Sequence, residues 1–177
     1  AFGYWNQFIG LRMGDKSELT KECKDRLLCI IRAVSWVESK HGSAGQNQPQ
    51  KDPMQSGNPH DTWWKSLTGQ LGHGDRFVGG PNKPNYWTDE LPGAVRQDMK
   101  QNDPTGKKKH VYDLSPIDPK LGHKDEKYNP DMSFFWGIPY LIHNINTAGP
   151  DGRTYNCGDC SEERMIKGAI KYNGGGN

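Results

Sequence analysis

Residues 27–42, LLCIIRAVSWVESKHG, decide the fold that we predict for this chain. A helix turns by about 100° per residue, so apolar positions three and four residues apart share one face. The apolar face predicted here consists of Leu27, Ile30, Ile31, Val34 and Val37. Glu38 falls near the middle of this face, where burial disfavours a charged carboxylate. We therefore expect the pKa of Glu38 to lie above its ordinary value of about 4.3.

Glu38 also lies in the last turn of the predicted helix, where the helix dipole disfavours negative charge. A carboxyl group that keeps its proton near neutral pH can protonate a leaving oxygen. The alternative is a structural role, in which Glu38 pairs with an arginine or caps a buried amide. His41 and Gly42 follow, and we expect Gly42 to end the helix in the left-handed conformation.

Three or four helices are expected, so the fold class is mostly α, or α+β at most. The predicted ranges are 18–41, 61–67, 133–148 and 162–172. Residues of the stretch 15–17 are expected to cap the first helix, Asp61 or Thr62 the second, and Ser161 the last. Pro139 should start or kink the third helix, because it cannot donate a backbone hydrogen bond.

The composition suits one domain spanning residues 1–177, with a small core and long loops, because only 32% of the residues are hydrophobic and 22 are glycine. Residues 69–131 lack helical periodicity, and we expect a loop-rich insert that forms one wall of a cleft. The aromatic segment 1–14 is expected to pack on the body of the domain. Trp63 and Trp64 could be core residues or a platform for sugar rings, and the core is favoured.

The charge and the cysteines exclude some classes of function. A net charge of +2 gives no argument for nucleic-acid binding, and no apolar run approaches the length of a membrane span. Cys23 and Cys29, six residues apart on one helix, cannot bridge each other. Together with Cys157 and Cys160 they match zinc spacings poorly, so disulfides or free thiols are favoured over a metal. No cofactor is expected.

Four separated motifs occur in a fixed order. They are Glu38-Ser39, Met54-Gln55, Gly137-x-x-Tyr140-Leu141 and Ala169-x-x-Tyr172-Asn173-Gly174-Gly175. This series resembles the lysozyme-like superfamily, specifically the lytic transglycosylases and goose-type lysozymes of glycoside hydrolase family 23. The sequence around Met54 also resembles lysozyme modules of phage tails and of contact-dependent bacterial toxins. Asp52-Pro53 and Gly174 depart from the family pattern, and the insert has no counterpart there.

The resemblance implies that Glu38 is the catalytic acid. The substrate-binding residues that it implies are Ser39, Met54, Gln55, Tyr140, Tyr172 and Asn173. In this interpretation Ser39 orients the acid or the substrate, and Gln55 bonds the substrate above a packed Met54. Tyr172 bonds near the acid and Asn173 holds a sugar amide, so that this pair closes the cleft.

The expected reaction is cleavage of peptidoglycan between N-acetylmuramic acid and N-acetylglucosamine. A lysozyme that inverts needs a second carboxylate to activate water. Asp52 and Asp61 are the candidates, because they flank Met54-Gln55. Asp61 is more readily explained as a helix cap, whereas for Asp52 a turn before Pro53 and a catalytic role are equally good. A lytic transglycosylase would need Glu38 alone, and a chitinase or a wall-binding module of the same fold are further alternatives.

The expected partner is the peptidoglycan polysaccharide, with no nucleic acid and no membrane. The resemblance to toxins adds an immunity or inhibitor protein as a second partner. We expect a monomer that acts in the cell-wall compartment, secreted or periplasmic.

Overall fold

The computed structural model describes residues 2, 20–45, 47–68, 70, 117–147 and 161–174. In these ranges all regular secondary structure is helical, which confirms a mostly α fold. The elements are α2 (Lys21–Ser39), α3 (Thr62–Leu67), the 3-10 helix η2 (Gly122–Lys124), α6 (Pro130–Thr147) and α7 (Glu162–Tyr172).

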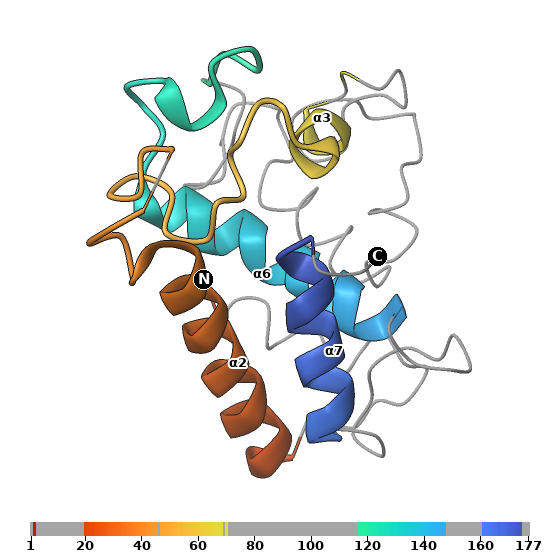
Figure 1. Ribbon diagram of the computed structural model, residues 1–177. Coiled ribbons are helices and arrows are strands. Elements are labelled where there is room, and N and C mark those ends of the chain that lie inside the picture. The colour runs from red at the N-terminus through yellow and green to blue at the C-terminus, as the bar shows by residue number, and fades with distance from the viewer. Residues whose placement is uncertain are drawn as a thin grey trace, which may run out of the picture.

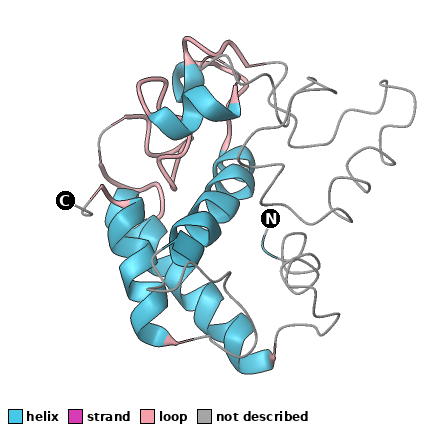
Figure 2. Cartoon of the chain, turned by 90° about the vertical axis from the view of Figure 1, so that its right-hand side faces the viewer, coloured by secondary structure: helices cyan, strands magenta, loops and turns pink. Residues whose placement is uncertain are grey.

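Three long helices form the body, and α2 and α7 lie side by side in front of α6 (Figure 1). A layer of loops with α3 and η2 covers one end of this group (Figure 2). The helices α6 and α7 approach each other closely, because Gly168 has no side chain. A Cβ atom at Gly168 would lie only 2.6 Å from the Cα atom of Ile145.

The core lies between these three helices and the loop layer. Its largest fully buried side chains are Leu27, Met54, Trp63, Trp64, Tyr128, Phe135, Trp136 and Ile138. The two tryptophans of α3 are 2% and 0% exposed, so the core interpretation of Trp63 and Trp64 is confirmed. Phe2 packs against this core, while the rest of segment 1–14 lies outside the described residues.

Helix α2 begins and ends at residues other than those expected. Thr20 is the N-cap, and its side chain accepts a hydrogen bond of 3.2 Å from the backbone of Cys23. The expected cap in 15–17 is therefore wrong. At the other end, Lys40 takes the left-handed conformation with φ of 48°, and His41 follows with φ of 56°. The turn out of the helix thus precedes Gly42.

The buried face of α2 also differs in one position from the predicted one. Leu27, Ile31 and Val34 are buried, but Val37 is 66% exposed, so its place on the apolar face was wrong. Ser35 and Ser39 are buried instead, at 0% and 1% exposure. Small polar side chains here let the following loop approach the helix closely.

The other helices agree with the sequence more closely. Asp61 caps α3 and Ser161 caps α7, as expected, and the Ser161 hydroxyl accepts a bond of 3.3 Å from the backbone of Arg164. Helix α6 begins at Pro130 and continues past Pro139, so Pro139 does not start it.

The segment 69–131 is not an insert along its whole length. Ile117, His123 and Tyr128 are 4%, 1% and 1% exposed, so residues from 117 onward belong to the core. The chain on either side of 71–116 meets at the carbonyl oxygen of Pro119. This oxygen accepts bonds of 2.7 Å from Trp64 Nε1 and 3.2 Å from Gln70 Nε2. We call this contact the neck. Residues 71–116 lie outside the described part.

The cysteines of α2 have different states. Cys23 is buried and disulfide-bonded, whereas Cys29 is exposed and free. They do not bridge each other, as the helix spacing predicted. Among the described helices, none is both long and apolar enough to cross a bilayer.

Candidate functional site

Glu38 lies in the last turn of α2, half-buried beneath the loop layer. Burial, together with the negative charges of Asp52 and Asp61, raises the pKa of its carboxyl group from 4.5 to about 7. The expected direction of this shift is confirmed. Within the described part of the chain, no hydrogen bond or ion pair holds the Glu38 carboxyl group, which excludes the alternative of an arginine partner there.

Ser39 attaches the end of α2 to the loop that carries the second motif. Its hydroxyl donates a hydrogen bond of 2.8 Å to the carbonyl oxygen of Pro53 and accepts one of 2.8 Å from the backbone of Gly42. At 1% exposure, Ser39 has no surface for a substrate. The substrate contact expected for Ser39 is therefore replaced by a contact that holds the loop beside Glu38.

Met54 lies at the centre of the site, where three helices meet the loop. Its carbonyl oxygen accepts a hydrogen bond of 2.7 Å from the hydroxyl of Tyr172 on α7. Its side chain lies against α6 at Gly137, where a Cβ atom would be 2.8 Å from Met54 Cβ and 3.0 Å from the Tyr172 hydroxyl. Met54 is fully buried, as expected for a residue packed below the site.

Gln55 is half-buried and has a left-handed backbone, with φ of 53°. Its side-chain Nε2 donates a hydrogen bond of 2.8 Å to the carbonyl oxygen of Asp52. This bond fixes the amide group at the surface of the loop. The amide oxygen, which makes no bond within the described residues, is left as an acceptor for a ligand.

A row of aromatic rings extends from the Tyr172 side of the site. The ring of Tyr140 is 4.9 Å from that of Tyr172 and is stacked on Trp63 at 4.6 Å. Burial raises the pKa of both tyrosines, and Glu38 contributes to both shifts. They are therefore neutral hydroxyl donors at physiological pH. Tyr172 donates to Met54 rather than to the acid, and Asn173 is exposed at the end of α7.

Asp61 is a half-buried carboxylate that is coupled to the acid. Its Oδ1 atom accepts a hydrogen bond of 2.6 Å from the backbone of Trp63, which confirms the capping interpretation. Burial raises the pKa of Asp61, while the bond from Trp63 and the charge of Lys65 lower it. Asp61 in turn raises the pKa of Tyr140 and of Glu38.

Asp52 is completely buried, and this corrects the expectation that it activates water. A side chain at 0% exposure cannot contact a substrate. Both carboxylate oxygens are occupied by donors from the protein. These donors are the backbone N–H groups of Ser56 and Gly57, the hydroxyls of Tyr128 and Ser133, and Nδ1 of His123.

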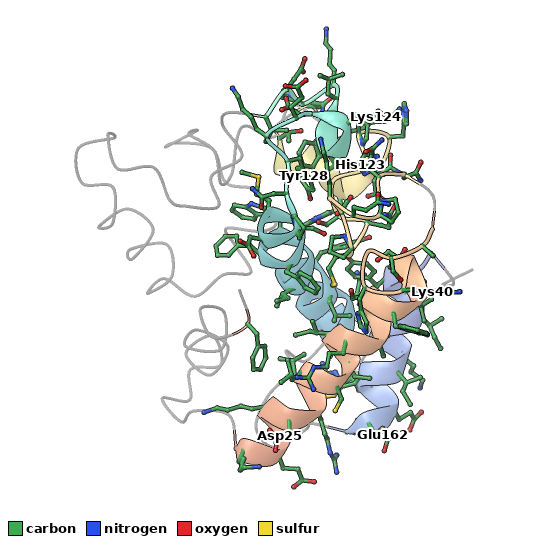
Figure 3. All side chains as sticks on the ribbon, turned by 90° about the vertical axis from the view of Figure 1, so that its left-hand side faces the viewer. Asp25, Lys40, His123, Lys124, Tyr128 and Glu162 are labelled. Carbon is green, nitrogen blue, oxygen red and sulfur yellow. The ribbon has the colours of Figure 1, made fainter. Side chains whose placement is uncertain are left out.

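Sequence reasoning missed His123, Tyr128 and Ser133, which surround Asp52. Figure 3 shows His123 and Tyr128 together in the loop layer, beyond the N-terminal end of α6. No local pattern in the sequence connects them to Asp52, which lies at least 71 residues earlier. Within the described ranges, no group of three or more His, Cys, Asp or Glu residues could hold a metal ion.

A surface pocket of about 620 Å³ lies at the opposite end of α2 and α7 from Glu38. Asp25 and Glu162 mark this end in Figure 3, and Lys40 marks the end beside the acid. Cys29, Ile30 and Met165 are among its lining residues. The pocket is therefore separate from the site around Glu38.

Comparison with family models, curated proteins and solved structures gives no match to this chain. What the geometry defines is a mostly helical domain in which one half-buried acid lies where four separated motifs meet.

Proposed function

We propose that this chain is a glycosidase that cleaves peptidoglycan between N-acetylmuramic acid and N-acetylglucosamine, with Glu38 as the general acid. One observation carries the proposal: the four motif segments converge around a carboxyl group whose pKa is about 7. Ser39 contacts the Met54 loop, and Tyr172 and Gly137 contact Met54 itself. Residues that are more than a hundred positions apart thus form one site.

Glycosidic cleavage requires a proton on the leaving oxygen. Below pH 7 the Glu38 carboxyl group holds that proton, and it has no competing bond within the described residues. The carbonyl and amide groups around Gln55 supply hydrogen-bonding partners for the acetamido and hydroxyl groups of a sugar. The stacked ring of Tyr140 supplies a half-buried apolar surface beside the acid.

Hydrolysis needs a second carboxylate, and Asp61 takes this role in our proposal. It is half-buried rather than buried, and it is close enough to Glu38 to raise the pKa of the acid. Only its Oδ1 atom is bonded within the described residues, by the backbone of Trp63. The Oδ2 atom is therefore free to orient a water molecule.

The second candidate function is lytic transglycosylation. It is favoured by the burial of Asp52, which removes one of the two carboxylates that would support hydrolysis. In that reaction the acetamido and 6-hydroxyl groups of the substrate complete the chemistry, and Glu38 is the only carboxylate required. A chitinase would use the same residues on a polymer without muramic acid.

The compartment that we propose is outside the cytoplasm, in the cell wall or periplasm. The disulfide of Cys23 supports this proposal, because disulfides persist in oxidising compartments.

Mass spectrometry of the soluble products from purified peptidoglycan tests the proposal. The wild-type chain should release muropeptides, and Glu38→Gln should release none. Glu163→Gln is the matched control, because Glu163 is an exposed glutamate of α7. Reducing ends in the products indicate hydrolysis, which Asp61→Asn should abolish. Anhydro ends indicate transglycosylation, which Asp61→Asn should spare. Wild-type cleavage by Glu38→Gln would overturn the assignment of the acid.

A further inference from the structure

Asp52 lies where three parts of the chain meet. The carboxylate belongs to the loop that carries Met54 and Gln55. It receives bonds from η2, through His123 Nδ1 at 2.9 Å, and from α6, through the Ser133 hydroxyl at 2.6 Å. The side chain of Asp52 thus connects its own loop to residues that lie 71 and 81 positions later in the chain.

The directions of these bonds follow from a proton count. The backbone N–H groups of Ser56 and Gly57 can only donate, and they reach different oxygens of Asp52, at 3.0 and 2.8 Å. Ser133 accepts from the backbone of Met54 at 2.9 Å, so its own proton points to Asp52. Both oxygens of Asp52 are therefore acceptors, and His123 carries its proton on Nδ1.

Asp52 connects the parts of the site through its backbone as well as through its carboxylate. Gln55 bonds the backbone oxygen of Asp52 through both its backbone and its side-chain nitrogen, at 3.0 and 2.8 Å. The Ser133 hydroxyl, held by Asp52, in turn holds the backbone of Met54. Loss of the carboxylate would remove the bonds that connect this loop to Ser133 on α6 and to His123 on η2.

We propose that Asp52 is a positioning residue: it anchors the Met54–Gln55 loop to α6 and η2 and directs a buried negative charge at Glu38. It touches no substrate. The inference rests on the proposed function in that Glu38 is the acid that this charge serves. Four groups interact electrostatically with Glu38. They are the charged carboxylates of Asp52 and Asp61 and the neutral hydroxyls of Tyr140 and Tyr172.

Two variants separate the anchor from its charge. Asp52→Asn keeps the shape and removes the charge, but an amide offers only one acceptor oxygen for the N–H groups of Ser56 and Gly57. Tyr128→Phe removes one donor to Asp52, at 3.3 Å, together with the 3.1 Å bond between the hydroxyls of Tyr128 and Ser56, and it keeps the charge. The readouts are the thermal midpoint of unfolding and the ¹³C NMR titration of the Glu38 carboxyl, assigned with Glu38→Gln.

We expect both variants to unfold at lower temperature than the wild type. The titration midpoint of Glu38 is about 7 in the wild type, and it should be lower in Asp52→Asn. It should stay above 4.5 there, because burial is the largest cause of the shift. It should not fall in Tyr128→Phe. A role in folding alone would lower the stability of both variants without this difference between their titrations.

An unchanged Glu38 midpoint in Asp52→Asn, or wild-type stability of that variant, would overturn the proposal. If Asp52→Asn does not fold, Tyr128→Phe decides. Lower stability with a midpoint at or above the wild-type value supports the anchor, and a midpoint moved toward 4.5 overturns it. Neither readout uses enzymatic activity, so a chain that titrates as expected but leaves peptidoglycan intact would refute the proposed function and not the anchor.

Discussion

Replacing Glu38 with glutamine should stabilise the folded chain above pH 7 and leave its stability unchanged at pH 4. The pKa of Glu38 is raised in the folded state, from 4.5 to about 7. A group with a raised pKa favours the folded state below its unfolded pKa, and this contribution is lost as the pH rises through the folded pKa. The wild type therefore loses stability between about pH 4.5 and pH 7. Glutamine does not titrate and avoids this loss.

The magnitude follows from the size of the shift. One unit of pKa corresponds to about 1.4 kcal/mol, so the full shift of Glu38 would correspond to about 3 kcal/mol in the free energy of unfolding. Glu38 is only half-buried, and solvent screening reduces this figure to about 1–2 kcal/mol. For a chain of this length, we expect the midpoint of thermal unfolding to rise by about 3–6 °C at pH 8.

The assay is thermal unfolding of both proteins at pH 4 and pH 8, monitored by circular dichroism. Glu163→Gln is the control, since Glu163 is exposed and pairs with Lys167 at 2.7 Å. The bond from Lys167 lowers the pKa of Glu163, so removing that carboxylate should give no gain at pH 8. Equal differences between Glu38→Gln and wild type at the two pH values would refute the reasoning, as would a less stable variant at pH 8.

Three further predictions concern activity, packing and thiol chemistry. The rate of peptidoglycan clearance should fall as the pH rises through about 7, because Glu38 then loses the proton that it must donate; turbidity measured from pH 5 to pH 9 checks this. Gly137→Ala should lower the free energy of unfolding by about 1–3 kcal/mol, because the added Cβ atom would press on Met54 and the Tyr172 hydroxyl. Urea denaturation measures this change, and a variant as stable as the wild type would contradict the close approach. Cys29 should react with Ellman's reagent in the folded state, and Cys29→Ser should lose that signal; an equal signal from both proteins would show that Cys29 is shielded.

Features with a local cause could be predicted from the sequence. The helix that carries Glu38 follows from its apolar periodicity, and the raised pKa follows from placing a carboxyl group on that face. The caps Asp61 and Ser161 follow from their side-chain oxygens beside a helical pattern. The start of α2 does not follow, because Ser17 and Thr20 both carry an oxygen that can cap a helix and the local sequence does not decide between them.

The burial of Asp52 had no local cause. An aspartate before a proline is typical of an exposed turn, and the donors that make burial tolerable come from His123 and Ser133, far along the chain. Val37 was misplaced for a related reason. At the C-terminal end of α2 the buried residues are Ser35 and Ser39, and Ser39 bonds to the backbone of Pro53. Hydrophobic periodicity does not detect such a contact.

The neck at Pro119 holds the two sides of the chain that flank segment 71–116 next to each other. Trp64 and Gln70 on one side bond to the same carbonyl oxygen on the other, so the ends of segment 71–116 are already held together by the folded domain. An insertion between the two sides of the neck therefore has to bring its own two ends close together.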